Sequence, residues 1–444
     1  MLSEADCWEI AERVEQASPA DETEVFIECS RSALTRFANN IIHQNVAEEG
    51  IQVSVRVVVD SRTARATTNK IDAAALRCTV EQALASARWQ PQDPDLLPML
   101  GPQRYNPVTR VSAATAELSP QARAEAVRRV VARAEGFHLT AAGLYSNSYA
   151  TQALANARGL FAYYDETRAE FSLTCWNDKG SGWAKANFTA ADQLGIDELA
   201  ERACQKALAS QEPQELAPGR YTVILEPAAV LDLVGFLFYD FAATAIADQR
   251  SCFTERLGEK VFGENISIWD DAYHPLQTGS VWDGEGMPRQ KVTLVERGVV
   301  KNLVYSRQAA RKAGTKPTGH GFLLPNEYGE APMNLVFAGG DCSLDEMIRA
   351  TERGVLVTRL WYIREVDPYK KILTGMTRDA TFYVTDGTIQ YAIRNLRFNQ
   401  SILAMLSQVE MLGPAVRTAG EESFEMVVPA MKIADFHFTE GTKY

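Results

Sequence analysis

The five histidines are the residues best suited to bind a metal ion, and their spacing limits what they can do. A zincin-type site needs two histidines one helical turn apart, so that both imidazoles point the same way, with a glutamate nearby as the base. The two closest histidines, His274 and His320, are 46 residues apart, so no helix can present such a pair. A site built from distant ligands stays open, although single histidines with structural partners are the commoner outcome. The histidines are His43, His138, His274, His320 and His437.

No nucleophile motif is visible in the sequence. There is no G-x-S-x-G elbow and no phosphate-binding P-loop. The glycine-rich triplets at residues 180–182 and 284–286 are interpreted as loops, because neither has the flanking elements of a dinucleotide site. The seven cysteines are odd in number and form no C-x-x-C pair, which predicts reduced thiols in a cytoplasmic protein and not a disulfide framework.

Residues 314–321 combine flexible backbone with a cation and an imidazole. One interpretation is a substrate-binding loop in which Lys316, Thr318, Gly319 and His320 contact a peptide backbone or carboxylate. The other is a surface connection that follows a helix ending near residue 313. Composition alone favours the surface connection.

Residues 367–379 form a second dense polar stretch, which ends in Arg378 and Asp379. Opposite charges next to a hairpin usually form surface salt bridges that stabilise little. The alternative is the polar wall of a cavity, in which Arg378 would be a substrate-binding residue.

The elements that must position these residues belong to a globular protein. The formal net charge of -12 has no compensating basic block, so we expect no nucleic-acid partner. No signal peptide is visible at the N-terminus. The longest apolar run, residues 228–247, contains Asp232 and Asp240, and it predicts a buried helix and not a membrane span.

The first part of the chain predicts a mixed α/β domain over residues 1–90. Residues 51–59 alternate as a half-buried antiparallel strand, with Ser54 and Arg56 on the polar outer face. A proline-rich linker over residues 91–107 follows.

The rest of the chain divides into a small α/β middle domain, residues 110–212, and a β-rich C-terminal domain, residues 218–444. The C-terminal domain should hold an antiparallel sheet with hairpins at residues 291–305 and 381–393. The second hairpin turns on Asp-Gly, because both residues can adopt positive φ. The fold class is therefore α+β. The predicted helices outside the apolar run begin near Ser3, Asp72, Ser119 and Ile196.

Several stretches together resemble the TldD/PmbA family in their order and spacing, over nearly the whole chain. The family has two member types, which pair with each other. The stretches are residues 35–44 (TRFANNIIHQ), 50–59, 67–69, 258–261 (GEKV), 283–288 (DGEGMP), 295–307, 314–319 (GTKPTG), 354–357 and 384–387 (VTDG).

The resemblance implies a zinc site in one member type, TldD. There a His-Glu-x-x-x-His helix supplies two ligands, and a cysteine before the late hairpin supplies a third. In this chain the helix should fall within residues 230–248, which hold no histidine, and the cysteine should fall near Arg378, although no cysteine follows Cys342. All three ligands are missing, so no metal site is expected in this chain, and zinc is expected in a TldD-type partner.

The resemblance therefore favours a non-catalytic TldE/PmbA-type subunit that helps to enclose and hold unfolded peptides by strand addition. Its partner would be a TldD-type metallopeptidase subunit. An independent hydrolase that uses His320, Asp379 or Glu365 with a metal from distant positions stays open. So does a homodimeric peptide-binding or regulatory protein.

Overall fold

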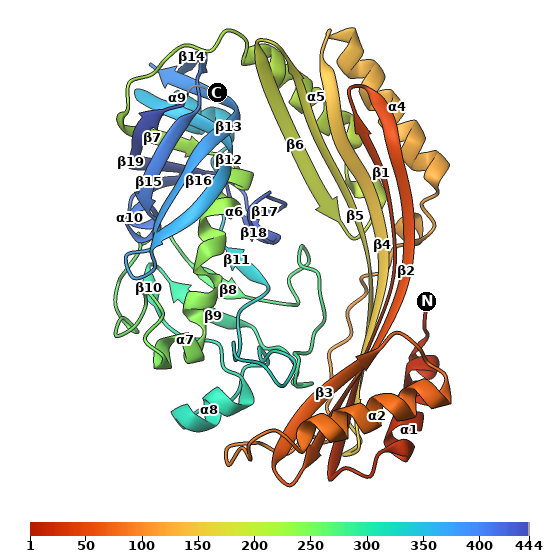
Figure 1. The fold of residues 1–444 in the computed structure, drawn as a ribbon. Helices are drawn as coiled ribbons and strands as arrows, with labels where there is room; N and C mark the ends of the chain where they lie inside the picture. The colour runs from red at the N-terminus through yellow and green to blue at the C-terminus, as the bar shows by residue number, and fades with distance from the viewer. Residues whose placement is uncertain (443–444) are drawn as a thin grey trace.

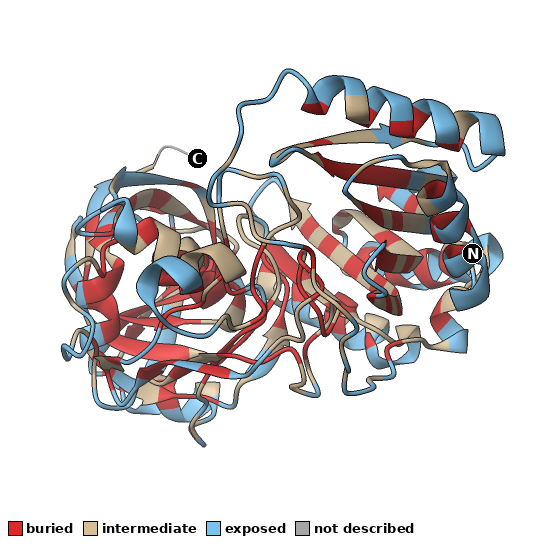
Figure 2. Ribbon diagram, turned by 90° about the horizontal axis from the view of Figure 1, so that it is seen from below, coloured by how far each residue is buried: buried red, intermediate tan, exposed pale blue. Residues whose placement is uncertain are grey.

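The computed structural model describes residues 1–442, which form an α+β protein with a large antiparallel sheet and a β-rich C-terminal domain (Figure 1). The predicted fold class is confirmed. No helix among the described residues is long and apolar enough to cross a membrane. Buried residues make up the interior of the C-terminal half, beneath exposed helices and loops, and they alternate with partly exposed residues along the strands of the large sheet (Figure 2).

The first half of the chain builds one six-stranded antiparallel sheet in the order β3-β2-β1-β4-β5-β6. The predicted N-terminal and middle parts therefore share a sheet, because β1 pairs with β4 over fourteen positions. The strands are β1 (Glu22–Ala38), β2 (Ile41–Val59), β3 (Arg62–Thr68), β4 (Thr140–Asn156), β5 (Phe161–Asn177) and β6 (Gly180–Phe188).

Two pairs of helices cover opposite ends of this sheet (Figure 1). The capping signals place their N-termini correctly. Ser3 and Asp6 form the capping box of the first helix, and Ser119 caps a helix with Pro120 at its first position. The pairs are α1 (Glu4–Ala17) with α2 (Ala73–Ala87), and α4 (Pro120–Gly136) with α5 (Ile196–Ala209), and the short α3 (Ala113–Ala116) lies between them in sequence.

Two local predictions about this half are wrong. Ser54 and Arg56 are buried, because C-terminal loops cover the face of β2 that was expected to be solvated. Arg56 there pairs with Glu24 at 2.9 Å. Residues 180–182 are not a loop, since they begin β6.

The C-terminal domain contains a small barrel. The strands β12-β7-β19-β15-β13 lie side by side, and β13 pairs back with β12 to close the ring. The predicted hairpin is present, with Asp386 and Gly387 at φ 50° and 72°. The strands are β7 (Gly219–Leu225), β12 (Arg353–Asp367), β13 (Ile372–Thr385), β14 (Thr388–Ile393), β15 (Leu396–Ser401), β16 (Val409–Leu412) and β19 (Met431–Gly441).

A second sheet and long loops complete this domain. The hairpin predicted at residues 291–305 is present, although its second strand has only two residues. The sheet order is β10 (Val299–Val300), β9 (Val292–Glu296), β8 (Ile268–Asp270), β11 (Leu335–Phe337), β18 (Met426–Val428) and β17 (Val416–Thr418), and the short helices are α8 (Arg307–Ala313), α9 (Leu344–Arg349) and α10 (Ile402–Ser407).

The apolar run at residues 228–247 is buried but is not one helix. It forms α6 (Pro227–Val234), a 3₁₀ segment (Gly235–Phe241) and α7 (Ala243–Ala247). Glycine and aromatic residues are weak helix formers, so the break falls where they gather. Asp240 then fixes the 3₁₀ segment, because its carboxylate pairs with Lys371 and accepts from the Cys252 backbone N–H.

Candidate functional site

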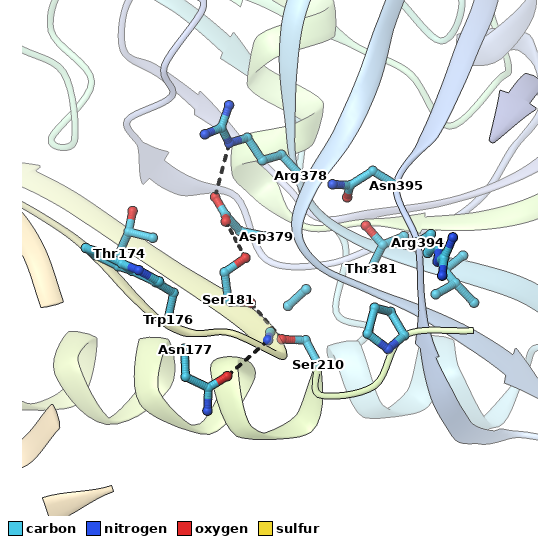
Figure 3. A pocket seen from close by; sticks show the side chains of 14 residues that line it. Thr174, Trp176, Asn177, Ser181, Ser210, Arg378, Asp379, Thr381, Arg394 and Asn395 are labelled. Atoms are coloured by element: carbon cyan, nitrogen blue, oxygen red, sulfur yellow. Dashed lines mark hydrogen bonds and ion pairs between the residues drawn. The ribbon is translucent and has the colours of Figure 1, made fainter. Parts of the chain in front are cut away.

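A pocket of about 510 Å³ lies where the large sheet meets the barrel (Figure 3). β6 is the last strand of the sheet, and it contacts both β13 and β17 of the C-terminal domain. The pocket lining comes from the sheet, from the end of α5 and from the barrel strands. It consists of Thr174, Trp176, Asn177, Gly180, Ser181, Ser210, Pro213, Arg378, Asp379, Ala380, Thr381, Ile393, Arg394 and Asn395.

A buried ion pair of the barrel contacts the sheet wall of this pocket through two residues of β6. Arg359 Nε donates to Asp379 Oδ2 at 2.7 Å, and its Nη2 contacts the same oxygen. Ser181 Oγ of β6 donates to Asp379 Oδ1 at 2.7 Å. The Arg359 guanidinium also lies 4.9 Å from the ring centre of Trp183, a second residue of β6. Asp379 is therefore fully engaged in joining the sheet to the barrel.

The backbone of β13 turns irregular at this point. Asp379 and Ala380 have φ of 49° and 68°, and the pairing register between β12 and β13 shifts nearby. Consecutive non-glycine residues with positive φ are uncommon, because Cβ crowds the backbone there. The irregularity removes the usual alternation of a strand, so residues 378–381 all line the pocket. Of the polar stretch 367–379, only Arg378 and Asp379 line this cavity, so the second interpretation holds for the end of the stretch alone.

A second polar site lies on α6, the segment in which the zinc helix was expected. Asp232 Oδ1 accepts from the backbone N–H groups of Glu421 and Glu422, at 3.2 and 3.1 Å. Its Oδ2 has no partner among the described residues. Burial raises the pKa of Asp232 to about 7, against the two hydrogen bonds, which lower it.

A pocket of about 370 Å³, lined by three phenylalanines and four other residues, includes the Glu421 and Glu422 that contact this aspartate. Glu422 of its lining accepts from the Tyr362 backbone N–H at 2.7 Å, and Lys185 of β6 donates to the Gly420 carbonyl at 3.0 Å. The lining consists of Gly235, Phe236, Phe238, Glu421, Glu422, Ser423 and Phe424.

The residues around α6 do not fit a zinc ion. Catalytic zinc sites use three protein ligands, and nitrogen or sulfur donors predominate among them. No group of three histidine, cysteine, aspartate or glutamate side chains that could hold a metal occurs within residues 1–442. The chain segment that contacts Asp232 is residues 420–422, whereas Arg378 lies in the other pocket. Arg378, near which the third ligand was expected, lines the other pocket and lies apart from α6, and the expected ligand position stays a prediction.

Residues 314–321 separate into an exposed half and a buried half. Lys316 is exposed, whereas His320 is completely enclosed. His320 Nε2 contacts Asp270 at 2.9 Å, and its Nδ1 contacts Thr318 at 2.9 Å. Gly319 has φ 75°, and a side chain there would collide with the Pro288 carbonyl. Substrate contact by Lys316, Thr318, Gly319 and His320 stays a prediction, and Arg378 does not lie with them.

Buried carboxylates organise the loops around this segment. Asp283 accepts from the backbone N–H groups of Glu285, Met287 and Gly321, at 2.7 to 2.9 Å. The Glu330 carboxylate accepts from the backbone N–H groups of Thr244 and Ser306. Backbone N–H groups in long loops need such acceptors when they are buried. The sequence motif at residues 283–288 therefore has a structural role.

The three residues of the alternative hydrolase site are engaged elsewhere. His320 contacts Asp270, Asp379 is paired with Arg359, and Glu365 accepts from Lys371 at 2.8 Å. Among the described residues, no recorded contact joins any two of the three.

Two features of the site were missed at the level of sequence. Asp232 could have been identified, because an aspartate within an apolar segment needs a polar partner or a functional role. In the sequence it served only as evidence against a membrane span. Trp176 and Thr381 could not have been identified, because the sequence of a strand does not show which cavity its residues border.

Comparison with known proteins identifies related domains over most of the chain. Residues 218–440 match the PmbA/TldA metallopeptidase C-terminal domain, residues 23–87 match domain 1, and residues 110–211 match the central domain. The metalloprotease PmbA of Escherichia coli O157:H7 is 23% identical over 410 residues, which cover 86% of this chain and 85% of that protein. A metalloprotease of Methanothermobacter thermautotrophicus is 26% identical over 295 residues, and the match spans 62% of each chain.

Solved structures share the fold. The TldE structure from Thermococcus kodakarensis superposes with a TM-score of 0.88 at 20% identity, covering 98% of this chain and all of that one. A protein from Thermotoga maritima described as a putative modulator of a DNA gyrase gives 0.87 at 20% identity, with the same coverage. The three matched segments together account for most of the sequence. The chain therefore belongs to the PmbA/TldA metallopeptidase family.

Proposed function

We propose that this chain is a non-catalytic subunit of the TldE/PmbA type, which pairs with a TldD-type zinc metallopeptidase and holds unfolded peptides for it. The observation that carries the proposal is the free edge of β6. Within the described residues β6 pairs with β5 on one side only, and its other edge is directed to the C-terminal domain (Figure 1).

An edge strand binds extended peptide through its own backbone. Unpaired N–H and C=O groups of the edge accept a further strand, and this pairing requires no particular side chains. β6 has nine residues and is roughly 30 Å long at about 3.3 Å per residue, and the Ser181 carbonyl near its start already accepts from Ser210 Oγ at 2.8 Å. Only a substrate that has no secondary structure of its own can pair in this way.

The composition of α6 supports the non-catalytic part of the proposal. Residues 230–248, within which the metal-binding helix was expected, hold no histidine or cysteine, and their carboxylates are Asp232, Asp240 and Asp248. Zinc and the hydrolytic step would then belong to the partner subunit. The seven cysteines, all free of disulfides, support a cytoplasmic location.

The first test measures assembly and cleavage. The chain is purified alone and together with a TldD-type protein from the same cell, and bound zinc and cleavage of an unstructured peptide are measured. We expect cleavage only from the pair, with zinc in the partner. Stoichiometric zinc and cleavage by this chain alone would contradict the proposal in favour of an independent hydrolase. A stable homodimer that does not bind the TldD-type protein would favour the alternative of a homodimeric regulatory protein.

The second test examines the binding mode. A fluorescent unstructured peptide is titrated with the chain, beside the same peptide N-methylated at alternate residues. Because methylation removes the N–H donors that strand addition uses, we expect affinity to fall at least tenfold. Equal binding of the two peptides would exclude strand addition.

A further inference from the structure

The pocket at the start of β6 carries one unmatched positive charge. Arg359 and Ser181 already occupy Asp379, so the Arg378 guanidinium, 3.8 Å from the same carboxylate, has only a shared partner. Arg378 instead lies over the Trp361 ring, 4.5 Å from its centre. Arg394 is paired with Glu215, which is highly exposed. The lining therefore favours a ligand with a single negative charge, since a phosphate dianion would need more than one free cation.

A buried hydroxyl group in the same wall lacks a partner. Thr381 is only 2% exposed, and its Oγ1 has no hydrogen bond among the described residues. It lies between Asp379 and Arg394 on the pocket wall (Figure 3). Leaving a buried donor unpaired is unfavourable, and side chains of this kind usually have a partner. The hydroxyl oxygen is enclosed by its neighbours, so an acceptor oxygen of a bound ligand would pair with it once the Thr381 side chain turns toward the pocket.

The remaining lining is suited to an apolar group beside that charge. Trp176, Ile393 and Pro213 line the pocket together with the polar wall. Pockets that combine apolar side chains with a few convergent polar groups fix the orientation of a ligand. Gly180 and Ser181, the first residues of β6, also line the pocket. A peptide added to the edge of β6 would therefore end in it.

We propose that this pocket binds the C-terminal carboxylate of an extended peptide, with Arg378 as its charge partner, Thr381 as a hydrogen-bond donor and Trp176 against the last side chain. The proposal rests on the peptide-binding function proposed above, and it defines the substrate class as peptides with a free C-terminus that lies near β6.

The test compares two peptides of one sequence, a free acid and a C-terminal amide, by fluorescence anisotropy with the full chain. We expect the amide to bind at least tenfold more weakly. Thr381→Val should weaken the free acid about threefold or more and leave the amide unchanged, without lowering Tm, because it removes an unpaired hydroxyl. Arg378→Gln, a change at a partly exposed residue, should have the larger effect on the free acid and also spare the amide.

The outcomes separate this inference from the proposed function. Equal binding of acid and amide, or equal losses for both peptides in the variants, overturns the carboxylate site alone. Absence of binding by either peptide overturns both proposals. An N-acetyl amino acid that competes as strongly as the whole peptide would overturn the peptide assignment, since the site would then take a small free acid.

Discussion

Asp379 on β13 and Asp232 on α6 are both buried, and both lie where the C-terminal domain approaches β6. Asp379 is joined to β6 through Ser181, and Asp232 contacts residues 420–422, whose Gly420 carbonyl accepts from Lys185 of β6. Their surroundings differ in one respect. Asp379 contacts a guanidinium and a hydroxyl, whereas Asp232 accepts from two backbone N–H groups and forms no ion pair with the residues that the structure describes.

This difference indicates which of the two carboxylates stabilises the fold. A buried carboxylate with a close cation stays charged and holds elements together, and removal of the cation leaves an uncompensated charge. A buried carboxylate without a cation is harder to ionise, so its pKa rises, as the value of about 7 for Asp232 indicates. The β13 region is therefore a structural joint, and the α6 region tolerates a group that is costly to ionise.

The largest effect should follow from Arg359→Ala. It leaves the Asp379 carboxylate buried without its main partner, so the free energy of unfolding should fall by about 3–5 kcal/mol. Urea denaturation measures it. Arg359→Lys is the matched control. It should lose less stability, because lysine keeps the positive charge, although it lacks the planar guanidinium that makes two contacts with the carboxylate. A loss below about 1 kcal/mol for Arg359→Ala would remove the distinction between the two regions.

A pH-dependent effect should follow from Asp232→Asn. Because the folded-state pKa of Asp232, about 7, lies above its usual value, the folded state binds more protons between about pH 4 and 7, and stability falls as pH rises through that window. The asparagine does not titrate. Relative to the wild type, the variant should gain about 3 kcal/mol in unfolding free energy between pH 5 and pH 8.

Urea denaturation at the two pH values checks this gain. Burial also raises the pKa of Glu285 to about 7, but that contribution is common to both proteins and cancels in the difference. A stability difference that does not change with pH would show that Asp232 is ionised throughout.

A smaller effect should follow from Ser181→Ala. It removes one hydrogen bond to the Asp379 carboxylate, so we expect a loss of about 1–2 kcal/mol. The loss should shrink in the Arg359→Ala background, because both changes act through the same carboxylate. Strict additivity in the double variant would mean that Ser181 stabilises the structure by another route.

The smallest effect on stability should follow from Arg378→Ala. Its side chain is 43% exposed and lies 3.8 Å from Asp379, so it should stabilise the fold by less than about 1 kcal/mol. Thermal denaturation checks this, with Arg359→Ala as the contrast. A loss as large as that of Arg359→Ala would make Arg378 part of the structural joint.

Local signals in the sequence were enough for many elements. The helix over residues 196–209 and the helix that Ser119 and Pro120 begin were predicted correctly, as was the Asp-Gly hairpin after β13. Capping, positive φ and hydrophobic period act within a few residues, so the chain carries them wherever it folds. The absence of histidine and cysteine from residues 230–248 was also visible, because it depends on residue types alone.

The burial and the partners of charged residues were decided by tertiary structure. Ser181 and Asp379 are 198 residues apart, and Arg56 is buried only because loops from the other half of the chain cover it. The position of Asp240 in the 3₁₀ segment after Gly235 is likewise held by the distant Lys371, which pairs with its carboxylate. Which charges are paired in a low-dielectric interior is a property of the assembled fold, since the energy of a buried ion depends on neighbours that local sequence does not name.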